Sequence, residues 1–332
     1  MRPFQYTKVN DASAAVQAVS ANANSQFLAG GTNLIDLMKE DVACPVELVD
    51  ITRLNLTQIS TVAESGNLSI GALAKNSDTA NHPVVRQNYP LLTQAILAGA
   101  SGQIRNMATN GGNLNQRTRC SYFYDTAMPC NKRELGSGCG ALEGINRYHA
   151  IFGWSEQCVA VYPSDMAIAL AALDAIVQVQ RADGTQRTIA FADYHRLPEN
   201  NPEKDNSLNP GELITAIELP TNNFADRSYY LKVRDRSSYA FALVSVAAAL
   251  EMDGNQIQQA RVAMGGVAHK PWRALEAEEF LTGKTATAAN FQAAAEAEMR
   301  QAKPLEHNQF KVELGKRIIA RALMQAMNDG RA

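Results

Sequence analysis

The chain has 332 residues, which is long enough for two or three domains with cores of their own. Hydrophobic residues make up 46% of it and charged residues 19%, a composition typical of folded domains and not of disordered chains. The net charge of −2 lacks the basic excess typical of nucleic-acid-binding proteins, and the apolar runs are too short to span a bilayer. We therefore expect neither a nucleic-acid partner nor membrane insertion.

The first residues, MRPFQYTKVND, show no basic region followed by an apolar one, so the sequence predicts no secretory signal of its own. Such a pattern suits a cytoplasmic protein, or one that folds inside the cell and is exported as the cargo of a partner. Five cysteines, an odd number, argue against a disulfide scaffold.

Helical and extended patterns alternate in the first third of the chain. DASAAVQAVSANA predicts a helix capped by Asp11 or Ser13, SQFL a short buried strand, TNLIDLMKE a helix and ELVDIT a strand. NLSIGAL predicts a strand that begins a second unit near Gly66, and SDTANHPVVRQ and PLLTQAILAGA predict helices after it.

Residues 117–157 break this pattern, because they are rich in Gly, Arg, Asn, Cys and aromatic residues and show no sustained period. An irregular stretch of this length inside a domain is unusual unless it is functional or disordered, and its cysteines favour a function. Regular patterns resume with a helix in SDMAIALAALDA and strands in AIVQVQ and ELITAIELP.

A third region begins near Asp226. RSYYLKVR and FALVSVAAALEM predict strands, and the turn Asp253-Gly254-Asn255 leads into IQQARVAMGG, which predicts an antiparallel hairpin. PWRALEAEEFLTG predicts a helix that ends at Gly283, and KVELGKRIIARALMQAMN predicts an amphipathic C-terminal helix.

Two Gly-Gly turns, FLAGGTNL and NMATNGGNL, carry hydroxyl and amide neighbours. Backbone N–H groups of such a turn can converge on an anion, and glycine permits both close approach and positive φ. A turn of this kind also occurs where a strand simply meets a helix. The pair together suits a long diphosphate cofactor held between two lobes. GSGCGA fits the G-x-G-x-x-A pattern but lacks the flanking strand and helix, so we do not assign it to a dinucleotide.

Four of the cysteines follow the spacing C-x9-C-x8-C-x18-C. Thiolate ligands of an iron–sulfur cluster, a zinc site and four unrelated buried cysteines all remain open on this spacing. Basic residues of the segment could offset the negative charge of a cluster; they are Arg117, Arg119, Lys132, Arg133 and Arg147. Cys44 is isolated, and we expect a core or surface residue there. We also expect the glycine turns and the cysteine segment to be separate elements.

The five histidines are scattered, with no His-x-x-x-His pair and no nucleophile motif beside them. The sequence therefore predicts no catalytic acid–base residue in this chain.

The motifs AGGTNL, IRNMATNGGNL, PSDMA, ELITAIELP, KVRDR, ALVSVA and GGVAHKPWRA follow one another over essentially the whole chain. In this order they resemble the FAD-binding subunits of the xanthine dehydrogenase family. The segment RTRCSYFYDT…PCNKR…GSGC is similar to an insertion in the FAD subunits of bacterial periplasmic molybdenum-containing aldehyde oxidoreductases.

This resemblance implies an α+β fold, with a two-lobed FAD-binding unit of the vanillyl-alcohol-oxidase type and a C-terminal α+β domain. The implied domains are residues 1–60, residues 61–222 with an iron–sulfur insertion at 117–158, and residues 223–332. The residues implied to bind FAD are Leu28, Ala29, Gly30, Gly31, Thr32, Asn33 and Leu34 at the pyrophosphate, Thr109, Gly112 and Asn113 in a second clasp, Asp165 as a hydrogen-bond partner, and Ile214 and Lys232 near the flavin.

The resemblance also implies that Cys120, Cys130, Cys139 and Cys158 ligate a 4Fe-4S cluster. The implied partners are a small subunit with two 2Fe-2S clusters, a large subunit with a molybdopterin cofactor, and an external electron acceptor. Electrons from aldehyde oxidation would pass through the small subunit to FAD. The implied location is the periplasm, reached as cargo of a partner's twin-arginine signal. The alternatives are a self-contained flavin oxidoreductase and a zinc-stabilised binding module without flavin.

Overall fold

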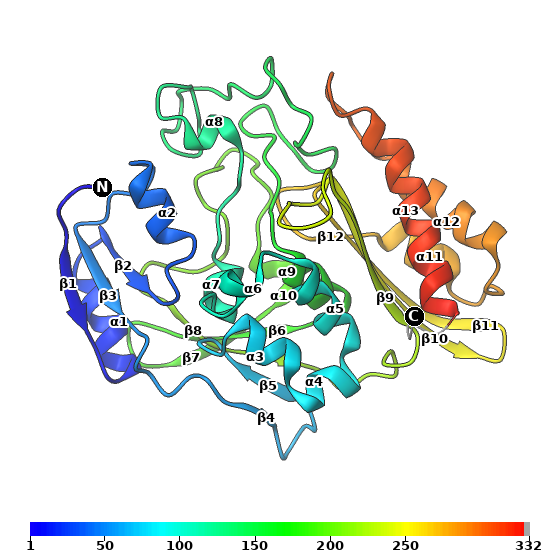
Figure 1. Ribbon diagram of the computed structural model, residues 1–332, viewed down its shortest axis with the longest axis horizontal. Coiled ribbons are helices and arrows are strands. Elements are labelled where there is room, and N and C mark those ends of the chain that lie inside the picture. Colours follow the sequence, from blue (N-terminus) through cyan, green and yellow to red (C-terminus); the bar gives the residue numbers. More distant parts are fainter. Residues whose placement is uncertain (329–332) are drawn as a thin grey trace.

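Three β-sheets organise residues 1–328, the part of the chain that the computed structural model describes (Figure 1). The predicted third domain ends at residue 332, so its last four residues lie outside this part. The mixture of sheets and helices confirms the predicted α+β class. In the same part of the chain, no helix combines the length and apolar character needed to cross a membrane.

The first sheet is parallel, with the strand order β1-β3-β2. Its strands are β1 (Gln5–Lys8), β2 (Ser25–Leu28) and β3 (Glu47–Asp50). Helix α1 (Ala12–Ala21) connects the first two, and the Asp11 carboxylate accepts a hydrogen bond from the Ala14 N–H, so the predicted cap is confirmed. Helix α2 (Leu34–Lys39) follows β2 directly after Gly30 and Gly31. The predicted strand–Gly–Gly–helix unit is therefore present.

The second sheet has five antiparallel strands in the order β4-β5-β8-β6-β7. They are β4 (Ile59–Thr61), β5 (Leu68–Gly71), β6 (Ile176–Gln180), β7 (Gln186–Ala190) and β8 (Leu213–Leu219). More than a hundred residues separate β5 from β6 and contain most of the helices of this region. These are α3 (Asn76–Asn81), α4 (Pro83–Asn88), α5 (Pro90–Ala98), α6 (Gly102–Arg105), α7 (Asn110–Leu114), α8 (Ser121–Tyr124) and α9 (Asp165–Ala172), with the short α10 (Phe191–Tyr194) after β7.

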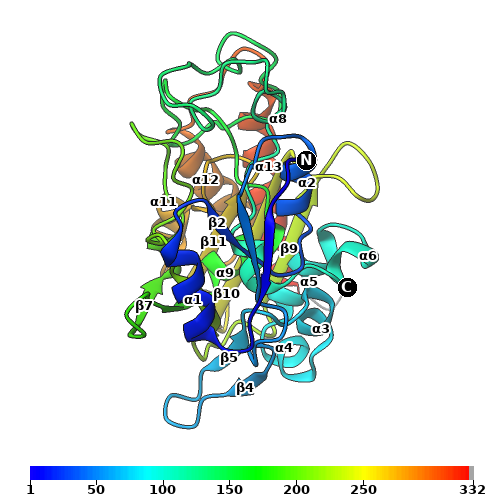
Figure 2. The same cartoon turned by 90° about the vertical axis from the view of Figure 1, so that its left-hand side faces the viewer.

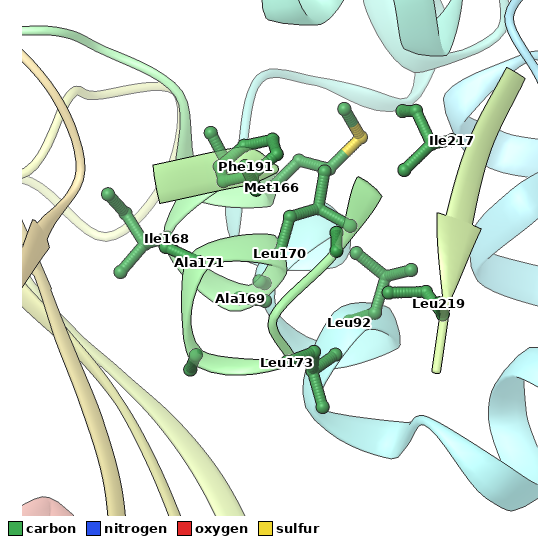
Figure 3. Close-up of a cluster of buried hydrophobic side chains, with 14 of the residues drawn as sticks. Leu92, Met166, Ile168, Ala169, Leu170, Ala171, Leu173, Phe191, Ile217 and Leu219 are labelled. Carbon is green, nitrogen blue, oxygen red and sulfur yellow. The ribbon is translucent and has the colours of Figure 1, made fainter. Parts of the chain in front are cut away.

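Helix α9 lies at the centre of the molecule, and all eight of its residues are buried. Figure 3 shows its side chains pointing in several directions, with Leu170 and Leu173 near Leu92 and Leu219. A helix that is apolar on every side must be covered on every side. This helix therefore packs against the second sheet, helix α5 and the third sheet at once.

The third sheet is antiparallel, with the order β12-β11-β10-β9. Its strands are β9 (Ser228–Val233), β10 (Val244–Asp253), β11 (Gln256–Gly265) and β12 (Trp272–Arg273), and β10 and β11 form the predicted hairpin. Three helices cover one face: α11 (Leu275–Leu281), α12 (Ala288–Met299) and α13 (Phe310–Met327).

The sequence of strand β10 is almost continuously apolar, and its position between two hydrophobic cores explains why. Val246 and Leu250 face the C-terminal helices, whereas Ala247 and Ala249 belong to the core around α9. Alternate residues of a strand point to opposite faces, so both faces here are buried. The small alanine side chains lie on the face toward α9, which lets that helix approach the sheet closely.

The cysteine segment, residues 117–157, stands at one end of the molecule in both views (Figures 1 and 2). Its only helix is the four-residue α8, and its extended contacts are isolated bridges such as Cys130–Cys139. The predicted lack of regular structure is confirmed. We propose the domain divisions 1–60, 61–222 and 223–332, because the first and third sheets then lie within one division each and the second sheet lies in 61–222 apart from the start of β4.

Gly265 of β11 lies against Ile168 of α9. A Cβ atom at this position would lie 2.7 Å from Ile168 Cγ1 and 2.5 Å from Ser245 Oγ. We expect Gly265→Ala to destabilise the chain by about 1–3 kcal/mol through overpacking. Ile168→Ala alone should cost about 2–4 kcal/mol by leaving a cavity.

In the double variant the extra methyl group occupies part of that cavity, so its destabilisation should be smaller than the sum of the two single changes. Urea unfolding of the four proteins measures this. Strict additivity would show that the two positions do not share one contact.

Candidate functional site

A cleft of about 410 Å³ lies between the Gly30-Gly31 turn and the end of the second sheet where β8 begins. Its walls come from segments that are far apart in the sequence. The turn side contributes Ala29, Gly30, Gly31, Thr32, Asn33 and Leu34, and the opposite side includes Ala72, Thr109, Gly111, Gly112, Arg117 and Ile214. Nine of the thirteen residues predicted to bind FAD are therefore brought together in one place.

The backbone N–H groups of the first turn have no protein partner. Within residues 1–328, no hydrogen bond uses the N–H of any residue from Gly30 to Leu34. Unpaired N–H groups near the start of a helix favour an anion, because they present a concentrated positive potential. This turn can therefore hold a phosphate.

The Asn33 side chain adds a further donor. Its Oδ1 accepts the Arg117 N–H at 2.9 Å, which fixes the orientation of the amide. Its Nδ2 is buried and has no hydrogen-bond partner among the described residues. A buried unpaired donor is costly, so a ligand oxygen at this position would satisfy it.

The two glycines are needed for different reasons. Gly31 has φ +72°, a conformation that other residues rarely adopt. A Cβ atom on Gly30 would overlap the carbonyl oxygen of Met107. Gly30 is therefore required by packing of the turn against the chain before α7, and not only by a ligand.

The second turn differs, because the protein itself uses its N–H groups. Asn110 N donates to Ala74 O, Gly111 N to Ala72 O, and Gly112 N to Thr109 Oγ1. This turn therefore packs α7 against the second lobe. It forms part of the cleft wall and contributes the Thr109 hydroxyl to it. It has no series of unpaired N–H groups that could bind an anion.

Asn113 lies behind this wall and not on it. Its Nδ2 donates to Asn76 Oδ1 at 2.9 Å, and its Oδ1 accepts from Ser164 Oγ at 2.5 Å. It thereby joins α7 to α3 and α9. Leu28 also lies outside the cleft lining.

Asp165 and Lys232 lie away from the cleft and bind each other. Lys232 Nζ donates to Asp165 Oδ2 at 2.8 Å, and Tyr230 OH donates to Asp165 Oδ1 at 2.6 Å. The side chains of Lys232 and Asp165 are both almost fully buried. The pair joins the start of α9 to β9 and so connects the core around α9 to the third sheet.

The four clustered cysteines, Cys120, Cys130, Cys139 and Cys158, line one small pocket. Burial raises the pKa of Cys120 to about 12 and that of Cys158 to about 11. Such thiols stay protonated at neutral pH unless a bound cation stabilises their thiolate form. Within residues 1–328, no three His, Cys, Asp or Glu side chains form a ready group for one metal ion.

His149 lies against this pocket, with Nε2 3.1 Å from Cys120 Sγ. Burial lowers the pKa of His149 to about 4, and the charge of Lys311 acts in the same direction. The imidazole is therefore neutral at physiological pH.

Asp205 connects the cleft and the cysteine pocket. Its carboxylate accepts from Arg117 Nε, 2.6 Å away, and from the ammonium of Lys132. Arg117 lines the cleft, and Lys132 lines the cysteine pocket. Burial alone would raise the pKa of the Asp205 carboxyl, but Lys132 and Arg117 outweigh it and hold the pKa well below its usual range. One carboxylate thus holds a cation at each site.

Helix α2 is attached directly to the cysteine segment. Asp36 pairs with Arg119 at 2.8 Å, and Leu37 packs in one buried cluster with Phe123 and Cys130. The expectation that the glycine turn and the cysteine segment are separate elements is therefore wrong. A sequence gives no sign of such contacts, because more than eighty residues separate the partners.

The roles of two residues of the site, Asp205 and Cys44, could not be predicted from the sequence. Asp205 is a single carboxylate in a polar stretch, and only its two basic partners give it a role. Cys44, expected in the core or at the surface, is an exposed residue at the margin of the cleft.

Two family models of known proteins match successive parts of the chain. Residues 2–222 match the model of the FAD binding domain in molybdopterin dehydrogenase, and residues 229–327 match the C-terminal domain of CO dehydrogenase flavoprotein. The aldehyde oxidoreductase FAD-binding subunit PaoB of Escherichia coli is 48% identical, over 98% of this chain and 99% of that protein.

The glyceraldehyde dehydrogenase medium chain of Sulfolobus acidocaldarius is 30% identical, over 85% of this chain and 82% of its own. A carbon monoxide dehydrogenase structure from Hydrogenophaga pseudoflava superposes with a TM-score of 0.77 at 24% identity, covering 98% of each chain. The latter likeness concerns the fold alone.

Replacing Asp205 by Asn tests the connection between cleft and pocket. The buried Lys132 ammonium would lose its counter-charge, so we expect a loss of about 3 kcal/mol in the free energy of unfolding at pH 7. Because the carboxyl pKa is lowered by folding, its stabilisation is present above the ordinary aspartate pKa of about 4 and is lost as the pH falls below it.

The difference between wild type and Asp205→Asn should therefore be constant from about pH 5 to 7 and shrink below about pH 4. Urea unfolding followed by tryptophan fluorescence across this range measures it. A difference that does not change with acidification would contradict the ion-pair assignment.

Proposed function

The chain belongs to the family of FAD-binding subunits of the molybdenum hydroxylases, and we propose that it transfers electrons within a complex that oxidises aldehydes to carboxylic acids. Because residues 2–222 match a family of FAD-binding domains, the cofactor of this chain is FAD. The aldehyde substrate is supported by the names of two relatives that are 48% and 30% identical over 98% and 85% of the chain, an aldehyde oxidoreductase subunit and a glyceraldehyde dehydrogenase chain.

One observation carries the FAD assignment, namely the free N–H groups from Gly30 to Leu34 in a cleft of about 410 Å³. We propose that these groups and Asn33 Nδ2 hold the pyrophosphate, with Thr109 and Gly112 on the opposite wall and Ile214 against the flavin. Leu28, Asn113 and the Asp165–Lys232 pair would support this arrangement from behind the lining. When bound, FAD supplies the ability to exchange electrons singly or in pairs.

The cleft offers little for acid–base chemistry on a substrate. Its carboxylate Glu212 pairs with Arg187 at 2.6 Å, and its guanidinium Arg117 pairs with Asp205. No histidine lines the cleft within the described residues. This supports a chain that holds and tunes FAD while a partner oxidises the substrate, and it gives no support to a self-contained oxidoreductase.

We further propose that the four clustered cysteines bind a 4Fe-4S cluster. Tetrahedral zinc would need its four sulfurs about 4 Å apart. A cluster holds thiolates at the corners of a larger core. Four sulfurs that line one pocket suit the corners of such a core. Lys132 beside the pocket would offset part of the cluster's negative charge.

The proposed partners are a molybdopterin-containing large subunit, a small subunit with 2Fe-2S clusters, and an external acceptor that receives electrons from FAD. We propose a periplasmic location, reached in folded form with a partner that carries a twin-arginine signal. Subunits that co-purify with the tagged chain, and the cell fraction that contains it, test both statements.

Gly31 and Gly66 provide a matched test of the phosphate assignment. Both have φ +72°, so an alanine costs each a similar backbone strain, about 1 kcal/mol. In Gly31→Ala, relief of this strain moves the free N–H groups, and we expect FAD affinity to fall about tenfold. In Gly66→Ala, in the turn between β4 and β5, affinity should not change.

Flavin fluorescence released on denaturation gives the FAD content, and titration of the stripped protein gives the affinity. Equal FAD affinity in both variants would overturn the assignment of the first turn.

Cys130→Ser tests the cluster assignment, with Cys44→Ser as a control. We expect the first variant to lose cluster iron and the broad visible absorbance of an iron–sulfur centre, and the second to keep both. Because Cys130 packs with Leu37 of α2, FAD content should also fall in Cys130→Ser.

Iron, zinc and acid-labile sulfide analysis of the complex provides the measurement, with the iron and sulfide of the small subunit's 2Fe-2S clusters subtracted. Zinc in wild type, without iron and sulfide beyond those of the 2Fe-2S clusters, would contradict the cluster.

A further inference from the structure

The imidazole of His149 faces the pocket of the four cysteines. Its Nε2 is 3.1 Å from Cys120 Sγ, and the side chain is 5% exposed. Its other ring nitrogen, Nδ1, is buried and has no hydrogen-bond partner among the described residues. Within residues 1–328, the ring therefore makes its only polar contact with the cysteine sulfur.

This contact has a defined direction once the sulfur is a thiolate. A metal-bound thiolate carries no proton and can only accept a hydrogen bond. The proton must then be on Nε2, and Nδ1 remains as an unprotonated acceptor. An unpaired lone pair is the cheaper group to leave buried, since an unpaired N–H would lose a strong hydrogen bond to water.

The position of His149 is fixed from the C-terminal domain. Its carbonyl oxygen accepts from Asn308 Nδ2 at 3.1 Å and from Lys311 Nζ at 2.9 Å. Asn308 and Lys311 are both fully buried, and Lys311 also donates to Gly266 O. Two side chains from the region of α13 thus hold the backbone of a residue in the cysteine segment, so the ring has little freedom to turn away from Cys120.

We propose that His149 is a positioning residue that donates a hydrogen bond from Nε2 to the Cys120 thiolate and raises the reduction potential of the cluster. The reduced cluster carries one more negative charge than the oxidised cluster, so a donor to its ligand stabilises the reduced form more. The inference rests on the proposed 4Fe-4S cluster and adds a determinant of its potential.

The test compares the full chain, in its complex, as wild type, His149→Leu and His149→Gln. Leu removes the donor, whereas the Gln amide N–H can reach a position near that of Nε2. His307→Gln changes a side chain that is 43% exposed and serves as the control. Redox titration followed by electron paramagnetic resonance gives the midpoint potential of the cluster, and iron analysis gives its content.

We expect a lower midpoint potential in His149→Leu than in wild type, partial recovery in His149→Gln and no change in His307→Gln. An unchanged potential in a His149→Leu protein with full iron content overturns the inference and leaves the cluster assignment intact. Wild-type complex whose cluster iron does not exceed the iron of the small subunit's 2Fe-2S clusters overturns the cluster assignment itself.

A second measurement covers the case in which His149→Leu fails to fold. In wild type with ¹⁵N-labelled histidine, pulsed electron paramagnetic resonance of the reduced cluster should show a nitrogen coupling, and His149→Gln should lack it. Absence of this coupling in wild type also overturns the inference.

Discussion

The carboxylate of Asp205 is the constraint that joins the two sites of this protein. It lies between Arg117, which lines the cleft, and Lys132, which lines the cysteine pocket. Lys132 is almost completely buried, and a buried ammonium is tolerated only beside a counter-charge and hydrogen-bond acceptors. Asp205 supplies the charge, and the carbonyl oxygen of Pro202 supplies a further acceptor. Without this arrangement, neither the end of the cleft nor the floor of the pocket would have its present charge.

Contacts of side chains also explain how the irregular cysteine segment keeps one shape. Residues 117–157 contain a single short helix, so side-chain contacts must replace a regular backbone ladder. Arg133 does this locally by donating to the carbonyl oxygens of Tyr122 and Phe123. Leu37 and Asn308 attach the segment to the first lobe and to the C-terminal domain. The segment is thus held by every part of the chain that surrounds it.

Sequence patterns predicted the elements well where one period dominates. Helix α1 with its Asp11 cap and the β10–β11 hairpin follow from local signals that need no tertiary context. The patterns could not predict that Asn113 and Lys232 turn away from the cleft, because their side chains are bound by residues distant in the sequence. Nor could they predict that α2 packs on the cysteine segment. Such contacts depend on the final arrangement of the lobes, and no local period encodes them.

The two Gly-Gly turns show why a motif alone does not define a phosphate site. Both have paired glycines, which precede α2 in the first case and lie in the first turn of α7 in the second. In α7, Asn110 and Gly111 donate their N–H groups to the carbonyl oxygens of Ala74 and Ala72, so little capacity is left for an anion. In the turn before α2, the N–H groups from Gly30 to Leu34 have no protein partner among the described residues. The hydrogen-bond inventory of the backbone, and not the glycine pair, therefore distinguishes a turn that binds a ligand from one that packs the fold.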